Sequence, residues 1–131
     1  MSDVHDLRDA TVGQVLIPVT DLDRAVAFYR DALGARFLFT APPQMAFFQI
    51  GSTRLLVGVP EAGSDVGRGS MIYFQVPDIE RAHRTLSERG VAFAAPPALV
   101  HRDARMELWL APFDDPDGNP LALMTERDLG G

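Results

Sequence analysis

Apolar and polar positions follow the same order twice along the chain. In the first block, an apolar stretch at 12–19 precedes a segment at 21–33 whose apolar residues recur at helical spacing. Leu22, Ala25, Tyr29 and Leu33 fall on one face of this segment. Further short apolar runs, typical of strands, lie at 35–40, 44–50 and 54–59. The first block therefore predicts the order βαβββ.

The second block repeats the first. Val19-Thr-Asp-Leu-Asp-Arg-Ala25 matches Val76-Pro-Asp-Ile-Glu-Arg-Ala82, 57 positions further on, and both copies follow an apolar run. The pattern predicts a strand at 71–76 and a helix at about 79–89, and then strands at 91–94, 105–111 and 120–125. For the first helix, Thr20 with Asp23 resembles a capping box, and Gly34 suits the C-terminal end.

The repeat sets the domain organisation. We interpret 1–131 as a single domain built from modules 12–61 and 69–126. The polar, glycine-rich stretch EAGSDVGRG is interpreted as the connection, with the linker at 62–68.

Composition removes several classes of function. The 131 residues include no Cys and no Lys, which excludes disulfides, thiolate metal sites, Schiff-base chemistry and a P-loop lysine. The net charge of −6 argues against a nucleic-acid partner. No apolar run approaches the length of a membrane span, so we expect no membrane partner. The N-terminal MSDVHDLRD has no apolar signal-peptide core, and we expect a cytoplasmic protein.

Two motifs carry a resemblance to a known family. The first runs from Val19 to Gly34, and the second is the turn Asp115-Pro-Asp-Gly-Asn119 before the last expected strand. Together with the repeat they resemble the vicinal oxygen chelate superfamily, which includes glyoxalase I, bleomycin-resistance proteins and extradiol dioxygenases. The resemblance covers about residues 12–126. It implies an α+β fold of two βαβββ modules that form a half-open mixed sheet around a central cavity.

The resemblance also implies where metal ligands would lie. In the metal enzymes of the superfamily, ligands occupy the first and last strand of each module. The matching positions here are Gln14, Leu56, Met71 and Ala122. One amide, one thioether and two hydrocarbon side chains cannot hold Zn, Mg, Mn or Fe(II), which need several imidazole, carboxylate or carbonyl ligands. We therefore expect no metal and no other cofactor.

Strand alternation places further side chains on the face of the implied ligand positions. Arg54 could clamp an anionic ligand or be a solvated arginine, and Tyr73 would offer a phenol. Trp109 is interpreted as core or as an aromatic pocket wall. His101, assigned to a loop, could pair with Glu107 as an acid and base or as a displaced metal site, or simply lie beside a surface glutamate. The candidate ligand-binding residues are Gln14, Arg54, Leu56, Met71, Tyr73, His101, Trp109 and Ala122.

Three functions remain open. The first is a metal-free protein that binds or sequesters a small, partly aromatic molecule, as bleomycin-resistance proteins do. The second is an enzyme of the glyoxalase and dioxygenase family, an isomerase or lyase, with a metal-free or relocated site. The third is a structural or regulatory dimer with a vestigial cavity. We rank binding first and expect a homodimer, because half-open sheets expose edges and a face that a second chain can cover.

Overall fold

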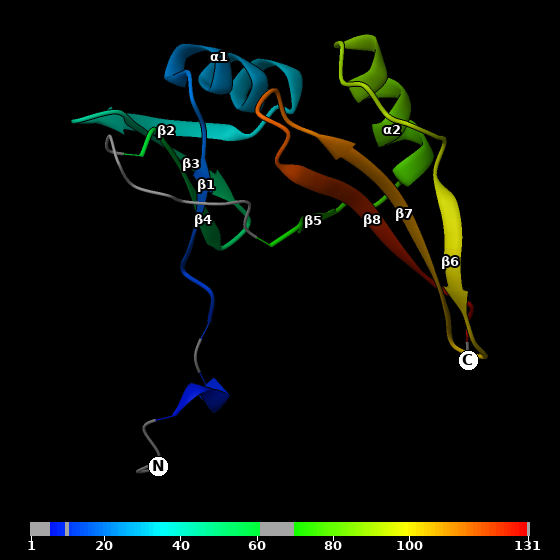
Figure 1. Cartoon of the computed structure of the whole chain (residues 1–131). Coiled ribbons are helices and arrows are strands. Elements are labelled where there is room, and N and C mark those ends of the chain that lie inside the picture. Colours follow the sequence, from blue (N-terminus) through cyan, green and yellow to red (C-terminus); the bar gives the residue numbers. More distant parts are fainter. Residues whose placement is uncertain (1–5, 10, 61–69, 131) are drawn as a thin grey trace.

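The computed structural model describes residues 6–9, 11–60 and 70–130. Two four-stranded sheets lie side by side, with one helical segment packed on each (Figure 1). The linker expected at 62–68 lies outside the described residues. The first module contains β1 (Gln14–Pro18), α1 (Leu22–Val26), η2 (Ala27–Ala32), β2 (Arg36–Ala41), β3 (Met45–Ile50) and β4 (Thr53–Gly58). The second contains β5 (Ile72–Gln75), α2 (Ile79–Glu88), β6 (Ala98–Arg102), β7 (Met106–Asp114) and β8 (Pro120–Asp128), and a short 3₁₀ turn, η1 (Leu7–Asp9), precedes both.

Both sheets have the same topology, which confirms the predicted α+β fold of two open βαβββ modules. The strand orders are β1-β4-β3-β2 and β5-β8-β7-β6. In each sheet the first and last strands of the module pair in parallel, and the other pairs are antiparallel. The register shifts once in each edge pair, between Phe37 and Phe39 and between Leu99 and His101. Each edge pair therefore contains one bulge, but the two bulges lie at different positions of the modules.

The two helices begin in the same way, but not as a capping box. Asp21 and Asp78, which occupy matching places in the repeat, have extended backbones, and their carboxylates accept hydrogen bonds from the third residue along. The bonds from Arg24 N and Arg81 N each measure 3.1 Å. The expected cap at Thr20 is wrong, because the Thr20 hydroxyl donates instead to Asp117, 2.5 Å away.

The second module departs from the predicted strands at one place. Residues 91–94 form no strand, although Val91 is buried and Phe93 makes a single bridge to Phe113. The strand that pairs with β7 is β6, eight residues after Gly90, and His101 lies within it rather than in a loop. Every residue of β6 is exposed, so the edge strand lacks the apolar alternation by which strands are found in a sequence.

One hydrophobic core runs through both modules. It includes Ile17, Leu55 and Val57 from the first sheet and Leu121 and Leu123 from the second, all nearly inaccessible to solvent. These residues alternate with outward neighbours on the same strands and face the helices. In Figure 1, α1 and α2 lie at the top of the molecule, and the two sheets extend downward below them, the first on the left and the second on the right.

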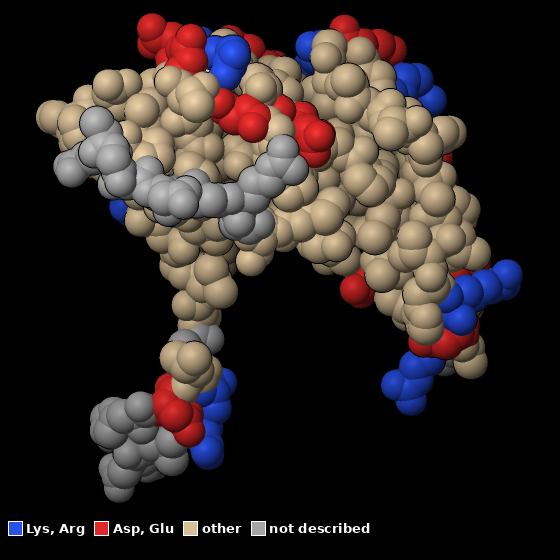
Figure 2. All heavy atoms as spheres, in the orientation of Figure 1, with Lys and Arg blue, Asp and Glu red and all other residues tan. Residues whose placement is uncertain are grey.

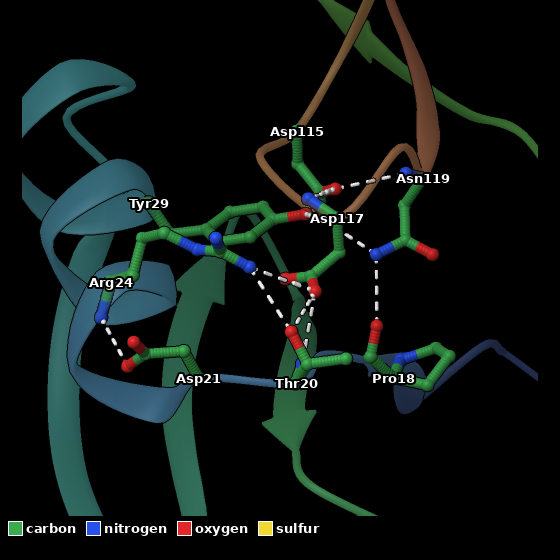
Figure 3. Close-up of polar contacts among 8 residues, drawn as sticks. All are labelled: Pro18, Thr20, Asp21, Arg24, Tyr29, Asp115, Asp117 and Asn119. Atoms are coloured by element: carbon green, nitrogen blue, oxygen red, sulfur yellow. Dashed lines mark hydrogen bonds and ion pairs between the residues drawn. The ribbon is translucent and has the colours of Figure 1, made fainter.

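A polar cluster at the turn 115–119 joins the modules (Figure 3). Asp115 is 5% exposed, and its carboxylate accepts four hydrogen bonds. One comes from the hydroxyl of the fully buried Tyr29 on η2, at 2.8 Å. Asn119 donates to the same carboxylate at 2.7 Å and to the carbonyl of Pro18 at 2.9 Å. The turn of the second module therefore holds the first strand and the helix of the first.

Asp117 adds a second tie from the same turn. Its Oδ1 accepts bonds from the backbone and hydroxyl of Thr20 and from Arg24 Nη2, which lies 3.1 Å away (Figure 3). The Asp117 side chain is nearly buried, whereas that of Arg24 is half exposed.

Among the described residues no helix is long and apolar enough to cross a membrane.

Candidate binding surface on the open face of the sheets

Each sheet has one face turned away from the helices, and we call these two faces together the open face. In the first sheet, Gln14 lies opposite Arg54 and Leu16 opposite Leu56. In the second sheet, Tyr73 lies opposite Ala122. The residues between them on each strand point into the core. The register thus places Gln14, Arg54, Leu56, Tyr73 and Ala122 on one side of the molecule.

The open face of the first sheet carries an aromatic platform. The rings of Phe39 and Phe47 stack, with centroids 4.6 Å apart and planes 25° from parallel. The guanidinium carbon of Arg54 lies 5.7 Å from the centroid of Phe47, within the range of a cation–π contact. Arg54 is thus in contact with a ring rather than with solvent alone. It lies against an aromatic ring and remains exposed.

The open face leaves large apolar side chains in contact with solvent. Leu16 is 52% exposed, Tyr73 49% and Phe39 45%. Exposed apolar side chains gathered on one face, with polar tips beside them, are typical of a surface that covers a ligand or a partner.

The positions that would hold a metal in related enzymes do not form a metal site. Ala122 is fully buried, Leu56 is half-buried, and Met71 precedes β5 as a half-buried thioether. Only Gln14 offers an oxygen. Across the part of the chain that the structure describes, no three His, Asp or Glu side chains gather closely enough to bind a metal ion. The donor set does not fit the metal of the metal-dependent relatives.

The proposed pair of His101 and Glu107 does not form. In the pairing of β6 with β7, Glu107 lies opposite Arg102, whereas His101 lies opposite Leu108 and so faces the other way. His101 Nε2 contacts Asp103 at 3.1 Å. Backbone hydrogen bonding from Arg105, and then the contact with His101, lower the pKa of Asp103. Glu107 accepts a bond from Trp109 Nε1 and lies 3.4 Å from Arg102.

Trp109 lies on the opposite side of its sheet from the open face. It pairs with Thr125, a buried residue whose hydroxyl donates to the carbonyl of Val76. The guanidinium carbon of Arg127 lies 4.9 Å from the tryptophan ring and the same side chain forms an ion pair with Glu80 of α2. Of the two interpretations of Trp109, core and pocket wall, the structure supports the core.

Sequence reasoning missed the aromatic platform. Phe39 and Phe47 belong to the runs FLFTA and MAFFQI, which contain the pairs Phe37 and Phe39, and Phe47 and Phe48. Adjacent residues of a strand point to opposite faces, whereas residues two positions apart point to the same face in a regular strand. Phe48 enters the core, so its neighbour Phe47 must face outward. The strand signal was present, but the bulge between Phe37 and Phe39 changes the alternation and hides which phenylalanine faces solvent.

The fold and this surface define a two-module α+β protein with an open sheet face and without the metal ligands of the metal-dependent relatives. The model of the Glyoxalase/Bleomycin resistance protein/Dioxygenase superfamily matches residues 11–123, so the chain belongs to that superfamily. No curated protein matches the chain.

Solved structures share the fold. A member of the same superfamily from Sphaerobacter thermophilus is 29% identical, with a TM-score of 0.74 over 88% of this chain and 97% of that one. A lactoylglutathione lyase from Agrobacterium tumefaciens is 22% identical, with a TM-score of 0.71 over 88% and 93%. A superfamily member from Nocardioides is 21% identical, with a TM-score of 0.75 over 95% and 89%. At these identities the last two support the fold alone.

Proposed function

We propose that this protein binds a small, partly aromatic molecule on the open face of its sheets, without a metal. The observation that carries the proposal is the aromatic platform of Phe39 and Phe47 beside Arg54. A flat guest would stack on the exposed rings, and such contacts contribute about 0.5–1.5 kcal/mol beyond the burial of area. Gln14 and Tyr73 would orient the guest through hydrogen bonds.

The polar groups define the chemistry of the guest. Arg54 is already placed over a ring, so an anionic group stacked beside the platform would meet the guanidinium without moving it far. The amide of Gln14 lies opposite Arg54 in the register and offers both a donor and an acceptor. An aromatic acid satisfies both groups, and it becomes the first ligand class to test.

A direct binding experiment tests the proposal. A panel of aromatic acids, acyl thioesters and cationic glycopeptide drugs would be screened by thermal shift, and each hit measured by isothermal titration calorimetry. Tryptophan fluorescence is unsuited to this screen, because Trp109 lies on the far side of its sheet. We expect Phe47→Leu and Arg54→Ala each to weaken an aromatic acid about five- to tenfold, on the scale of one stacking or cation–π contact.

The matched control is Arg105→Ala, which removes an exposed arginine from the turn between β6 and β7. It has the same change in charge as Arg54→Ala and should leave the affinity unchanged. Equal affinity in Phe47→Leu, Arg54→Ala and Arg105→Ala would show that the open face is not the binding surface.

We further propose that two chains associate as a homodimer. The open face carries the exposed apolar residues Leu16, Tyr73 and Phe39, and the edge strands β2 and β6 each pair on one side only. A second chain could cover part of this surface and complete the enclosure of a guest. Light scattering at micromolar concentration should give about twice 14.3 kDa. A monomer across the micromolar range would contradict this proposal.

A further inference from the structure

A hollow lies on the opposite side of the sheets from the open face. It has a volume of about 490 Å³ and lies between α2 and the segment Leu33–Ala35 that follows η2. We call it the interhelical groove. Its floor includes Leu55, Phe113 and Leu123, which face the helices and belong to the shared core. The volume is within the range of small-molecule sites.

One wall of the interhelical groove is a face of α2. Arg81 and Thr85 lie one turn apart on this face, and Arg89, which caps the C-terminal end of α2, follows at the same four-residue spacing; all three line the groove. Two guanidinium groups therefore flank the groove, with their Cα atoms about 12 Å apart along the helix axis. Ala82 and Leu86, also in the lining, place apolar surface beneath them.

Arg89 reaches across the groove to the first module. Its Nη1 lies 3.3 Å from where a Cβ on Gly34 would be. Gly34 has a φ of 75°, a conformation that follows a helical C-terminus and favours glycine. The absence of a side chain at Gly34 therefore leaves the room in which the Arg89 guanidinium lies.

These two cations have no ionic partner within the described part of the chain. No ion pair there includes the side chain of Arg81 or Arg89. The one acidic residue in the lining is Asp78, whose Oδ1 accepts the bond from Arg81 N that caps α2. In a protein with a net charge of −6, two unpaired arginines beside an apolar floor form a locally cationic site.

We propose that the interhelical groove binds a small anionic amphiphile, such as a medium-chain carboxylate. The carboxylate accepts hydrogen bonds from the Arg89 guanidinium, and the chain lies along the apolar floor beneath Leu86 and Ala82. Arg81, two turns away, adds a favourable field at the other end of the groove. The site shares no residue with the aromatic platform, so a guest on the open face and an amphiphile in the groove bind separately.

Calorimetric titration with decanoate tests this site, with decyltrimethylammonium as a probe of equal chain length and opposite charge. We expect one decanoate per chain and much weaker binding of the cation. Arg89→Gln should weaken decanoate about tenfold, as expected for the loss of a charge-assisted hydrogen bond, and Arg81→Gln about two- to threefold. Ala82→Met, which narrows the groove, should also weaken it.

The matched control is Arg84→Gln, on the same helix but outside the lining. It should bind decanoate as the wild type does. Unchanged affinity in Arg89→Gln and Arg81→Gln, equal binding of the two probes, or no decanoate binding would each overturn the proposal. Loss of decanoate binding in Arg54→Ala with retention in Arg89→Gln would move the amphiphile to the open face and would also overturn it. None of these results bears on aromatic acids at the platform.

Discussion

Removing one buried hydroxyl, in Tyr29→Phe, should destabilise the joint between the two modules. The Tyr29 side chain is 0% exposed, and its hydroxyl donates to Asp115 Oδ2 over 2.8 Å. Phenylalanine keeps the ring and its packing but leaves that carboxylate oxygen with only the 2.7 Å bond from Asn119. A hydrogen bond to a charged group contributes about 1.5–3 kcal/mol. Because one partner remains, we expect the lower part of that range, about 1.5–2 kcal/mol.

Urea denaturation measures this loss directly. For a chain of this size, about 1.5–2 kcal/mol corresponds to a decrease in Tm of about 5–7 °C. The denaturant midpoint should fall with little change in the m-value, since the same surface is exposed on unfolding. The control is Tyr73→Phe, which removes a hydroxyl from a side chain that is half exposed. A loss below about 0.5 kcal/mol in Tyr29→Phe, or an equal loss in both variants, would show that the hydrogen bond from Tyr29 to Asp115 does not stabilise the joint.

Three further outcomes follow from the structure. Burial, and then the Asp115 carboxylate, raise the pKa of Tyr29 far above its ordinary value. The neutral Tyr29 hydroxyl stabilises the fold fully below about pH 10, and this stabilisation is lost as the pH rises further. Above about pH 10 the free energy of unfolding should therefore fall by up to about 1.4 kcal/mol per pH unit, and the fall should be smaller in Tyr29→Phe. Asp21→Ala should cost about 1 kcal/mol of stability and Asp23→Ala clearly less, measured by thermal unfolding, because Asp21 caps the helix. Elemental analysis of protein purified without chelator should find no stoichiometric divalent metal; one tightly held ion per chain, lost in Gln14→Ala, would contradict the reasoning on the donor set.

Much of the fold could be predicted because its signals are local and repeated. Matching segments beginning at Val19 and Val76 place two strand-to-helix units, and the structure begins both helices at the matching aspartates Asp21 and Asp78. The division into faces was also predictable. Alternation with Gln14 and Arg54 places Ile17 and Leu55 on the opposite, core side of the first sheet, and both are nearly inaccessible.

The features that were missed depend on tertiary context. Strand β6 is exposed at every position, so its sequence has no apolar pattern that would predict a strand. It is a strand because it pairs with β7. The π-helical turns at Ala27–Ala32 keep the apolar residues on one face. A search for apolar residues at helical spacing therefore cannot distinguish this segment from an α-helix. The interhelical groove is lined by residues of both modules. The spacing of Arg81, Thr85 and Arg89 indicates a site only because the fold places Gly34 of the first module opposite Arg89.

The residues that identify the family have a structural task in this chain. Tyr29 belongs to the segment from Val19 to Gly34, and Asp115 and Asn119 to the turn before β8; together they form the buried joint that ties the second module to the first (Figure 3). Acidic and basic side chains lie over α1 and α2 at the top of the molecule (Figure 2). The same motifs can therefore accompany different guests, because none of these residues lies on the open face. Differences in function must come from positions such as Gln14, Arg54 and Phe47, where substitution leaves the joint intact and changes what the exposed sheet can bind.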